Sequence, residues 1–167
     1  MAAAKMTVPE LEQFLRREFP QAFSAGDIAI EAADGASCRL RQRYSEQMLR
    51  PGGTVSGPTL MALADFAMYV VLLSAIGPIG LAVTTNLNIN FLRKGQPGQD
   101  VLAVAKLLKL GKRLAVGEVN LLSGTSPDPH RPRANRSGLT GRLAGLSRRA
   151  AAMPPYRSSG CPAGRAP

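Results

Sequence analysis

The sequence has few of the residues that build metal sites and disulfide frameworks. One histidine, His130, occurs in 167 residues, and it lies near the C-terminus. A histidine metal site in the core is therefore excluded, and neither a metal nor a cofactor is expected. The two cysteines, Cys38 and Cys161, show neither metal-ligand spacing nor the density of a disulfide-stapled secreted domain. We expect a cytoplasmic protein, because the N-terminus MAAAKMTVPELEQ turns acidic where a signal peptide needs its apolar stretch.

Acidic residues are scarce in the last part of the chain. Up to Thr125 there are 13 basic and 10 acidic residues, whereas from Ser126 onward there are eight arginines, no lysine and one acid. The net charge of +10 thus belongs mainly to the tail, where nucleic-acid binding would be non-specific and salt-dependent. The tail has a single aromatic residue, Tyr156, which does not favour a base-stacking platform. Because residues 123–167 hold seven of the 13 prolines, we expect this tail to be disordered or to be translated out of frame.

The longest apolar stretch, residues 60–83, raises a membrane helix as one interpretation. It carries Asp65 and is broken by Gly77-Pro78, and its uninterrupted run, residues 66–76, suits a buried core helix better. We therefore expect no membrane association. Ser56 is a plausible N-cap, and the glycine-proline pair ends a helix of about 20 residues.

The remaining pattern predicts one α+β domain over residues 1–122. A short amphipathic helix beginning at Pro9 is expected to cover the domain. Residues 28–44 alternate with period two around the turn signal Asp34-Gly35, which predicts a hairpin with one buried face and one basic face. Three extended segments between residues 81 and 122 predict a meander of neighbouring strands. An antiparallel sheet wrapped around one apolar helix accounts for this order.

Asp65 is the only formally charged residue between Arg50 and Arg93. A carboxylate is costly to bury on a helix that is apolar on nearly every face. It is either a structural group that is hydrogen-bonded to a loop or a partner chain, or a catalytic one. Because no Arg, Lys or His lies nearby in sequence, we favour catalysis. Such a carboxylate can act as a general base on water or as a nucleophile on an acyl carbon.

A glycine-rich loop, residues 52–57, leads into this helix, whose first N–H groups favour developing negative charge. The loop is either an oxyanion hole or merely a tight turn. Gly57 and Asp65 lie eight residues apart, about 12 Å along a helix, so one carbonyl cannot touch both. Two helices that meet antiparallel across a two-fold axis would bring Gly57 of one chain near Asp65 of the other. This arrangement predicts an obligate homodimer with composite sites.

Residues from about 48 to 122 resemble the hotdog-fold acyl-CoA thioesterases, in particular the phenylacetic-acid-degradation thioesterase subfamily. The most specific parts are LMALADFAMY and TTNLNINFLRKGQPGQDVLAVAKLLKLGKRLAVGEV. The resemblance implies a hotdog fold and hydrolysis of an acyl-CoA thioester. It implies that Asp65 activates water or attacks the thioester and that Gly57 of the partner protomer polarises the carbonyl. It also gives Thr84 the role of orienting the water, although an ordinary β-branched strand residue is an equal interpretation.

The chain departs from the family pattern in three places. Where many members have Asn and then His-Gly-Gly, it has Arg50 and Ser56-Gly57-Pro58, so Arg50 and Ser56 are candidate substrate-binding residues. In place of the family's last strand it has an Arg- and Pro-rich segment, so we expect an open sheet edge. Lys112 and Arg113 could meet the phosphates of coenzyme A, although solvated turn residues are the alternative.

Two other functions fit the resemblance. A hotdog hydratase generally needs a catalytic histidine, and His130 in the tail does not provide one. A non-catalytic hotdog protein that binds acyl-CoA would explain the missing Asn and His, but it has little reason to keep Asp65. Acyl specificity depends on which side chains line the cleft, with the candidates Met61, Met68, Tyr69 and Leu72, and the assembly is expected to be a homodimer or homotetramer.

Overall fold

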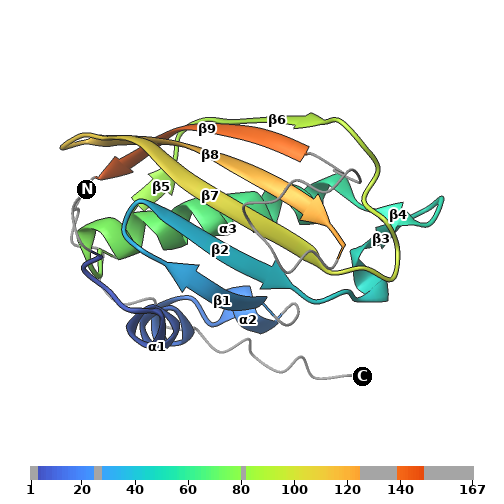
Figure 1. The fold of residues 1–167 in the computed structure, drawn as a ribbon, viewed down its shortest axis with the longest axis horizontal. Helices are drawn as coiled ribbons and strands as arrows, with labels where there is room; N and C mark the ends of the chain where they lie inside the picture. The colour runs from blue at the N-terminus through green and yellow to red at the C-terminus, as the bar shows by residue number, and fades with distance from the viewer. Residues whose placement is uncertain (1–3, 25–27, 80–81, 125–138, 149–167) are drawn as a thin grey trace, which may run out of the picture.

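The computed structural model describes residues 4–24, 28–79, 82–124 and 139–148. Figure 1 shows a curved antiparallel sheet that wraps around a long helix, α3, with the shorter helix α1 beside it. The predicted α+β architecture is therefore confirmed. The helices are α1 (Val8–Glu18), α2 (Gln21–Ser24), the 3-10 helix η1 (Glu46–Met48) and α3 (Gly57–Ile76). The strands are β1 (Ile28–Ala33), β2 (Ser37–Gln42), β3 (Leu49–Arg50), β4 (Thr54–Val55), β5 (Ala82–Thr84), β6 (Leu87–Phe91), β7 (Val101–Leu110), β8 (Leu114–Ser123) and β9 (Leu139–Arg148).

Helix α3 is the centre of the core, as the sequence predicts. Ser56 is its N-cap and accepts a hydrogen bond from the N–H of Thr59, while Gly77 ends it with a φ of 94°. By length and composition the helix could span a bilayer, but 67% of its most apolar window is buried inside the protein. It therefore serves as the apolar core that the sheet encloses. Its buried residues are Leu60, Leu63, Ala64, Phe66, Ala67, Met68, Val70, Val71, Leu72, Leu73, Ser74 and Ala75.

The order of strands corrects two predictions. The sheet runs β1-β2-β7-β8-β9-β5, and β6 also pairs with β9. The predicted meander is confirmed for β7 and β8, which are neighbours, but it is wrong for its first segment, because β8 and β9 lie between β7 and the strands β5 and β6. The chain passes from β6 to β7 through residues 92–100. The predicted lack of a last strand is also wrong, because residues 139–148 form β9 and satisfy the backbone groups along β8. The remaining tail residues, 125–138 and 149–167, lie outside the described residues. Within the described part of the chain, the sheet has two edges, β1 on one side and β5 with β6 on the other.

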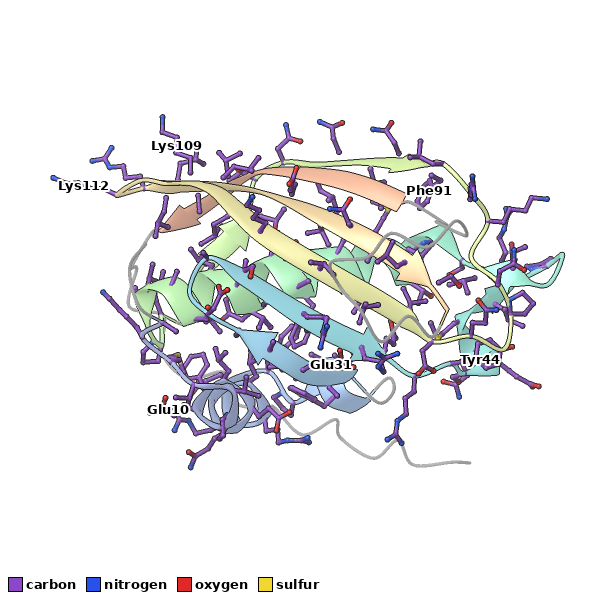
Figure 2. The ribbon with its side chains drawn as sticks, in the orientation of Figure 1. Glu10, Glu31, Tyr44, Phe91, Lys109 and Lys112 are labelled. Atoms are coloured by element: carbon purple, nitrogen blue, oxygen red, sulfur yellow. The ribbon has the colours of Figure 1, made fainter. Side chains whose placement is uncertain are left out.

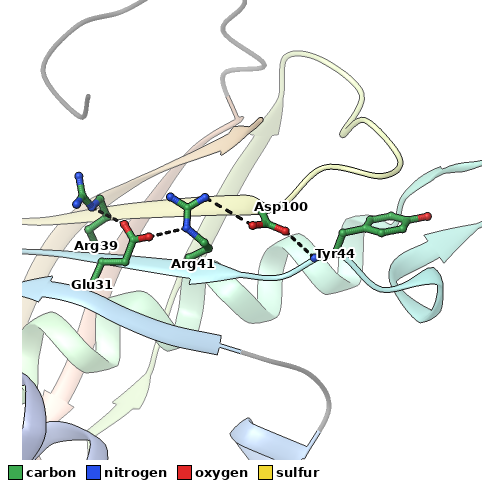
Figure 3. A network of polar contacts seen from close by, with 5 residues as sticks. All are labelled: Glu31, Arg39, Arg41, Tyr44 and Asp100. Carbon is green, nitrogen blue, oxygen red and sulfur yellow. Dashed lines mark hydrogen bonds and ion pairs between the residues drawn. The ribbon is translucent and has the colours of Figure 1, made fainter. Parts of the chain in front are cut away.

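The β1–β2 hairpin forms as predicted, but its outer face is not simply basic. Arg39 and Arg41 both lie against Glu31, and Arg39 Nε is 2.7 Å from Glu31 Oε2 without being aligned to donate a hydrogen bond. Asp100, the residue before β7, has its Oδ2 3.7 Å from Nη1 of Arg41, and its Oδ1 accepts a hydrogen bond of 3.0 Å from the N–H of Tyr44 (Figure 3). Two carboxylates thus balance the two arginines and tie the hairpin to the loop before β7.

Helix α1 lies against β1 and α3, which agrees with its predicted role as a cover. Leu11, Phe14 and Leu15 are buried. Phe19, which continues the helical spacing of these residues, is 43% exposed because the helix ends at residue 18 and Phe19 is its C-cap. Its ring centroid lies 6.2 Å from that of Phe66 on α3, so it still contributes to an aromatic contact between the two helices.

Candidate active site

Asp65 and Thr84 meet at the middle of helix α3. Asp65 is half-buried, and its Oδ1 accepts a hydrogen bond from the hydroxyl of Thr84 on β5. Among the described residues no cation forms an ion pair with Asp65. The carboxylate is therefore held in one orientation while its second oxygen stays available for another partner. The structure brings together two of the predicted catalytic residues, which lie 19 positions apart in the sequence.

Gly57 is the first residue of α3, so its N–H has no carbonyl partner within the helix. The preceding residue is fixed by a hydrogen bond of 2.7 Å from its own N–H to the carbonyl of Met48. Eight residues separate Gly57 from Asp65 on one continuous helix, about 12 Å along its axis. Within one protomer the free amide and the carboxylate therefore cannot contact the same small group.

Arg50 and Ser56, the two candidate substrate-binding residues before the helix, both make local contacts. Arg50 donates from Nε to the hydroxyl of Thr54 at 2.9 Å, across the β3–β4 turn. The hydroxyl of Ser56 lies 2.8 Å from that of Thr59 and caps the helix. Both side chains therefore stabilise the entry to α3. Glycine is required in the turn itself, because Gly52 and Gly53 have φ values of 97° and 68°.

Lys112 and Arg113 lie in the exposed β7–β8 turn. This turn lies just before β8, next to Ala115 at the first end of that strand. Phe91 pairs with Leu139 on β9, and Leu139 pairs with Leu121 near the opposite end of β8. Figure 2 shows Lys112 and Phe91 at opposite ends of the sheet. The turn is thus remote from Gly57, and within one protomer the structure does not bring the two predicted cations to the start of α3.

The four side chains considered for the acyl cleft differ in their burial. Of the four side chains considered for the cleft, Met68 and Leu72 are buried in the core at 1% and 0% exposure. Met61 is exposed at 36%, and Tyr69 is half-buried, with its pKa raised by burial and by the charge of Glu18. Met61 and Tyr69 therefore remain the accessible candidates. No group of three or more His, Cys, Asp or Glu residues within the described part of the chain could hold a metal ion.

Sequence reasoning missed one residue next to the start of α3. Phe91, at the end of β6, packs its ring against Gly57: a Cβ placed on Gly57 would lie 3.3 Å from Phe91 Cζ. Phe91 is half exposed, so it does not belong to a run of buried residues that a sequence pattern would reveal. It also lies 34 positions after Gly57, and local sequence patterns do not predict contacts over that separation. The only sequence signal was its place in the motif NINFLRKG.

The comparisons with known proteins agree with this fold. The model of the thioesterase superfamily matches residues 52–129. A solved structure of a protein assigned to the thioesterases, from Silicibacter sp. TM1040, is 36% identical and has a TM-score of 0.71, with 86% of this chain and 93% of that chain covered.

Two further structures support the fold alone. The Escherichia coli PaaI protein from the phenylacetic acid degradation operon is 20% identical, with a TM-score of 0.64 and coverage of 81% and 94%. A protein of Streptococcus pneumoniae TIGR4 assigned to the thioesterases, solved with coenzyme A, is 18% identical, with a TM-score of 0.64 and coverage of 82% and 95%.

An antiparallel sheet that encloses one long helix, with a carboxylate at the middle of that helix, defines a hotdog-fold protein of the thioesterase type. The chain belongs to the thioesterase superfamily.

Proposed function

We propose that this chain is an acyl-CoA thioesterase that hydrolyses small or medium acyl-CoAs in the cytoplasm. The observation that carries the proposal is Asp65, a half-buried carboxylate on an apolar helix that is oriented by Thr84 and forms no ion pair among the described residues. A hydrolase of this class needs such a group. The coenzyme A bound to the pneumococcal protein supports the choice of thioester. The likeness to PaaI supports the phenylacetic-acid-degradation subfamily.

In the proposed mechanism, Asp65 removes a proton from a water molecule as that water attacks the carbonyl carbon of the thioester. The carbonyl oxygen becomes an oxyanion, which the N–H of Gly57 stabilises at the helix N-terminus. When the tetrahedral intermediate collapses, the carbon–sulfur bond breaks, and the proton on Asp65 passes to the leaving thiolate. The products are a carboxylic acid and coenzyme A. Direct attack by Asp65 would instead give an anhydride that water then hydrolyses.

The mechanism needs two protomers, and one edge of the sheet offers the means to join them. Strands β5 and β6 form this edge, where Val83, Phe91 and Leu92 are exposed at 57%, 50% and 64%. Exposed apolar edge strands are prone to pair with another chain. A two-fold axis at this edge would align the copies of α3 antiparallel and bring Gly57 of one protomer toward Asp65 of its partner. We propose a homodimer on this basis, with pairing into a tetramer as a further step.

The first experiment compares hydrolysis of a panel of acyl-CoAs by the parent protein and by Asp65→Asn, measured as release of free thiol. We expect kcat/KM to fall by about 10²- to 10⁴-fold, because the general base is lost. Glu118→Gln removes a half-buried carboxylate on β8 and serves as the matched control. Sedimentation must show that all variants assemble equally. Equal activity of Asp65→Asn and the parent would refute the mechanism.

Substitutions of Gly57 test whether each active site is composed of residues from two protomers. Gly57→Pro removes the N–H, whereas Gly57→Ala adds a Cβ but keeps the N–H, so only the proline variant should lose about 10²-fold or more in kcat. A heterodimer of Gly57→Pro with Asp65→Asn holds one intact site if each site draws on both protomers. Mixed inactive variants should therefore regain activity, with half the parent's value as the upper limit. No regain from verified heterodimers would contradict the composite site.

A weakly active or inactive hotdog protein that binds acyl-CoA is the second candidate. It is favoured by the contacts of Arg50 and Ser56, since both side chains are engaged in local structure where the family has Asn and His. The same assay separates the two functions. A folded parent that binds acyl-CoA in calorimetry but releases no thiol would establish the binding protein.

A further inference from the structure

Two contacts from one segment converge on the start of helix α3. The ring of Phe91 lies over Gly57, where a Cβ would be 3.3, 3.7 and 3.9 Å from three of its ring carbons. Four residues further along, the carbonyl of Gly95 accepts a hydrogen bond of 3.3 Å from the N–H of Val55. Residues 91–95 therefore hold residues 55–57 from two points.

The fit at Gly95 is tight. A Cβ placed there would lie 2.9 Å from Cβ of Val55 and 3.2 Å from its Cγ2, closer than such atoms approach. Val55 itself is 4% exposed, so it has little room to move. Gly95 is buried as well, although it lies in a loop. The absence of a side chain at Gly95 thus allows the loop to close on the strand that leads into α3.

These contacts determine the direction of one peptide unit. The N–H of Gly57 belongs to the peptide that joins it to Ser56, and the carbonyl of that peptide accepts a hydrogen bond of 3.3 Å from the N–H of Leu60. The preceding peptide is held by the hydrogen bond of 2.7 Å from the N–H of Ser56 to the carbonyl of Met48. A peptide held on both sides cannot rotate freely, and an oxyanion donor acts only when it points at the developing charge. The ring of Phe91 supplies the restraint on the Gly57 side.

We propose that Phe91 and Gly95 are positioning residues that clamp the helix start and fix the direction of the Gly57 N–H. The inference rests on the proposed thioesterase function and deepens it, since it names residues that act on the oxyanion donor without touching the reacting atoms. Phe91 also lies on the open edge that we propose as the dimer seam. The test must therefore separate positioning from assembly.

Leu92 provides that separation. It is the next residue, it is 64% exposed, and it lies at the end of the same edge. Phe91→Ala and Leu92→Ala each remove apolar surface from the edge, but the three atoms nearest to a Cβ on Gly57 all belong to Phe91. Phe91→Tyr adds a hydroxyl at Cζ, the ring atom nearest Gly57, so it should also disturb the clamp. Gly95→Ala attacks the clamp from its other end while Phe91 stays in place.

The experiment measures kcat and KM with acyl-CoA, sedimentation, and hydrogen exchange of the peptide that covers residues 55–60. For Phe91→Ala and Gly95→Ala we expect kcat to fall about tenfold with KM changed less than about threefold, because a misdirected donor weakens the transition state more than substrate binding. Exchange in residues 55–60 should be several-fold faster. Leu92→Ala should match the parent in exchange of residues 55–60 and, at concentrations where sedimentation shows the parent's assembly, in kcat as well.

Three results would overturn the inference. The first is unchanged exchange in Phe91→Ala. The second is an equal loss of activity in Leu92→Ala, which would assign the effect to the dimer seam. The third is a rise in KM alone, which would make Phe91 a substrate contact. If the parent hydrolyses no thioester, the proposed function fails, while the exchange measurement still decides whether the clamp exists.

Discussion

Replacing Gly117 with alanine is expected to push helix α3 away from the sheet. Gly117 lies on β8 and is buried under the helix. A Cβ at this position would be 2.5 Å from Sδ of Met68, 2.6 Å from its Cε and 2.7 Å from the carbonyl oxygen of Lys106. Met68 is flexible but is 1% exposed, so it has no empty space to enter, and the carbonyl of Lys106 belongs to the β7–β8 ladder. Neither neighbour can yield without moving the core.

The expected cost follows from these contacts. Overpacking a well-packed core destabilises by about 1–3 kcal/mol. Replacing glycine with alanine also stabilises the folded protein by about 0.4–1 kcal/mol, because it lowers the conformational entropy of the unfolded chain. The net loss in the free energy of unfolding is therefore about 1–2 kcal/mol. For a chain of this size each kcal/mol corresponds to about 2–4 °C, so Tm should fall by about 2–8 °C.

Thermal and urea unfolding followed by circular dichroism would measure this loss. Asn120→Ala is the matched control, because Asn120 is exposed on the same strand, and it should change stability by less than about 0.5 kcal/mol. Thioester hydrolysis by Gly117→Ala should also decrease, since Asp65 lies one turn before Met68 on the displaced helix. A Tm at or above that of the parent would show that the helix does not rest on β8 as closely as the structure indicates.

Two further predictions concern titratable groups. Partial burial opposes the charge of Asp34, but hydrogen bonds from Ser37 and Ala36 lower its pKa. Because the folded pKa is lower than the unfolded one, its stabilisation is present above about pH 4 and is lost as the pH falls through the folded value. The difference in urea midpoint between the parent and Asp34→Asn should therefore shrink in acid, and a constant difference would contradict it. Burial raises the pKa of the Cys38 thiol to about 12, so in a Cys161→Ser background iodoacetamide should label Cys38 only under denaturant. Rapid labelling of the native protein would refute that burial.

Local sequence rules predicted the elements of this fold better than their arrangement. Ser56 and Gly77 bound α3 because capping requires a hydroxyl at one end and a positive φ at the other. The period-two alternation correctly gave the buried face of β2. The first segment of the meander was misplaced because strand neighbours, which are a long-range property, were inferred from order along the chain. Strand β9 was missed because the tail was judged as a whole by its proline and arginine content, although residues 139–148 contain no proline.

Some features of the candidate site could likewise be predicted from the sequence, whereas others required the structure. The isolation of Asp65 in a long uncharged stretch is visible in the sequence, and so is the glycine at the helix start. The contact between Asp65 and Thr84 agrees with their proposed roles but does not test those roles. The local contacts of Arg50 and Ser56 required coordinates, because a side chain's partner depends on the conformation of the turn that carries it.

The sequence by itself determined a long apolar helix with one carboxylate, the two ends of that helix, and a hairpin with a buried face. Those features follow from the periodicity and caps of neighbouring residues. Only the tertiary structure decided that β9 lies beside β8, that Glu31 and Asp100 balance the arginines of β2, and that Phe91 rests on Gly57. These contacts join residues far apart in the chain, and they exist only once the sheet has closed around α3.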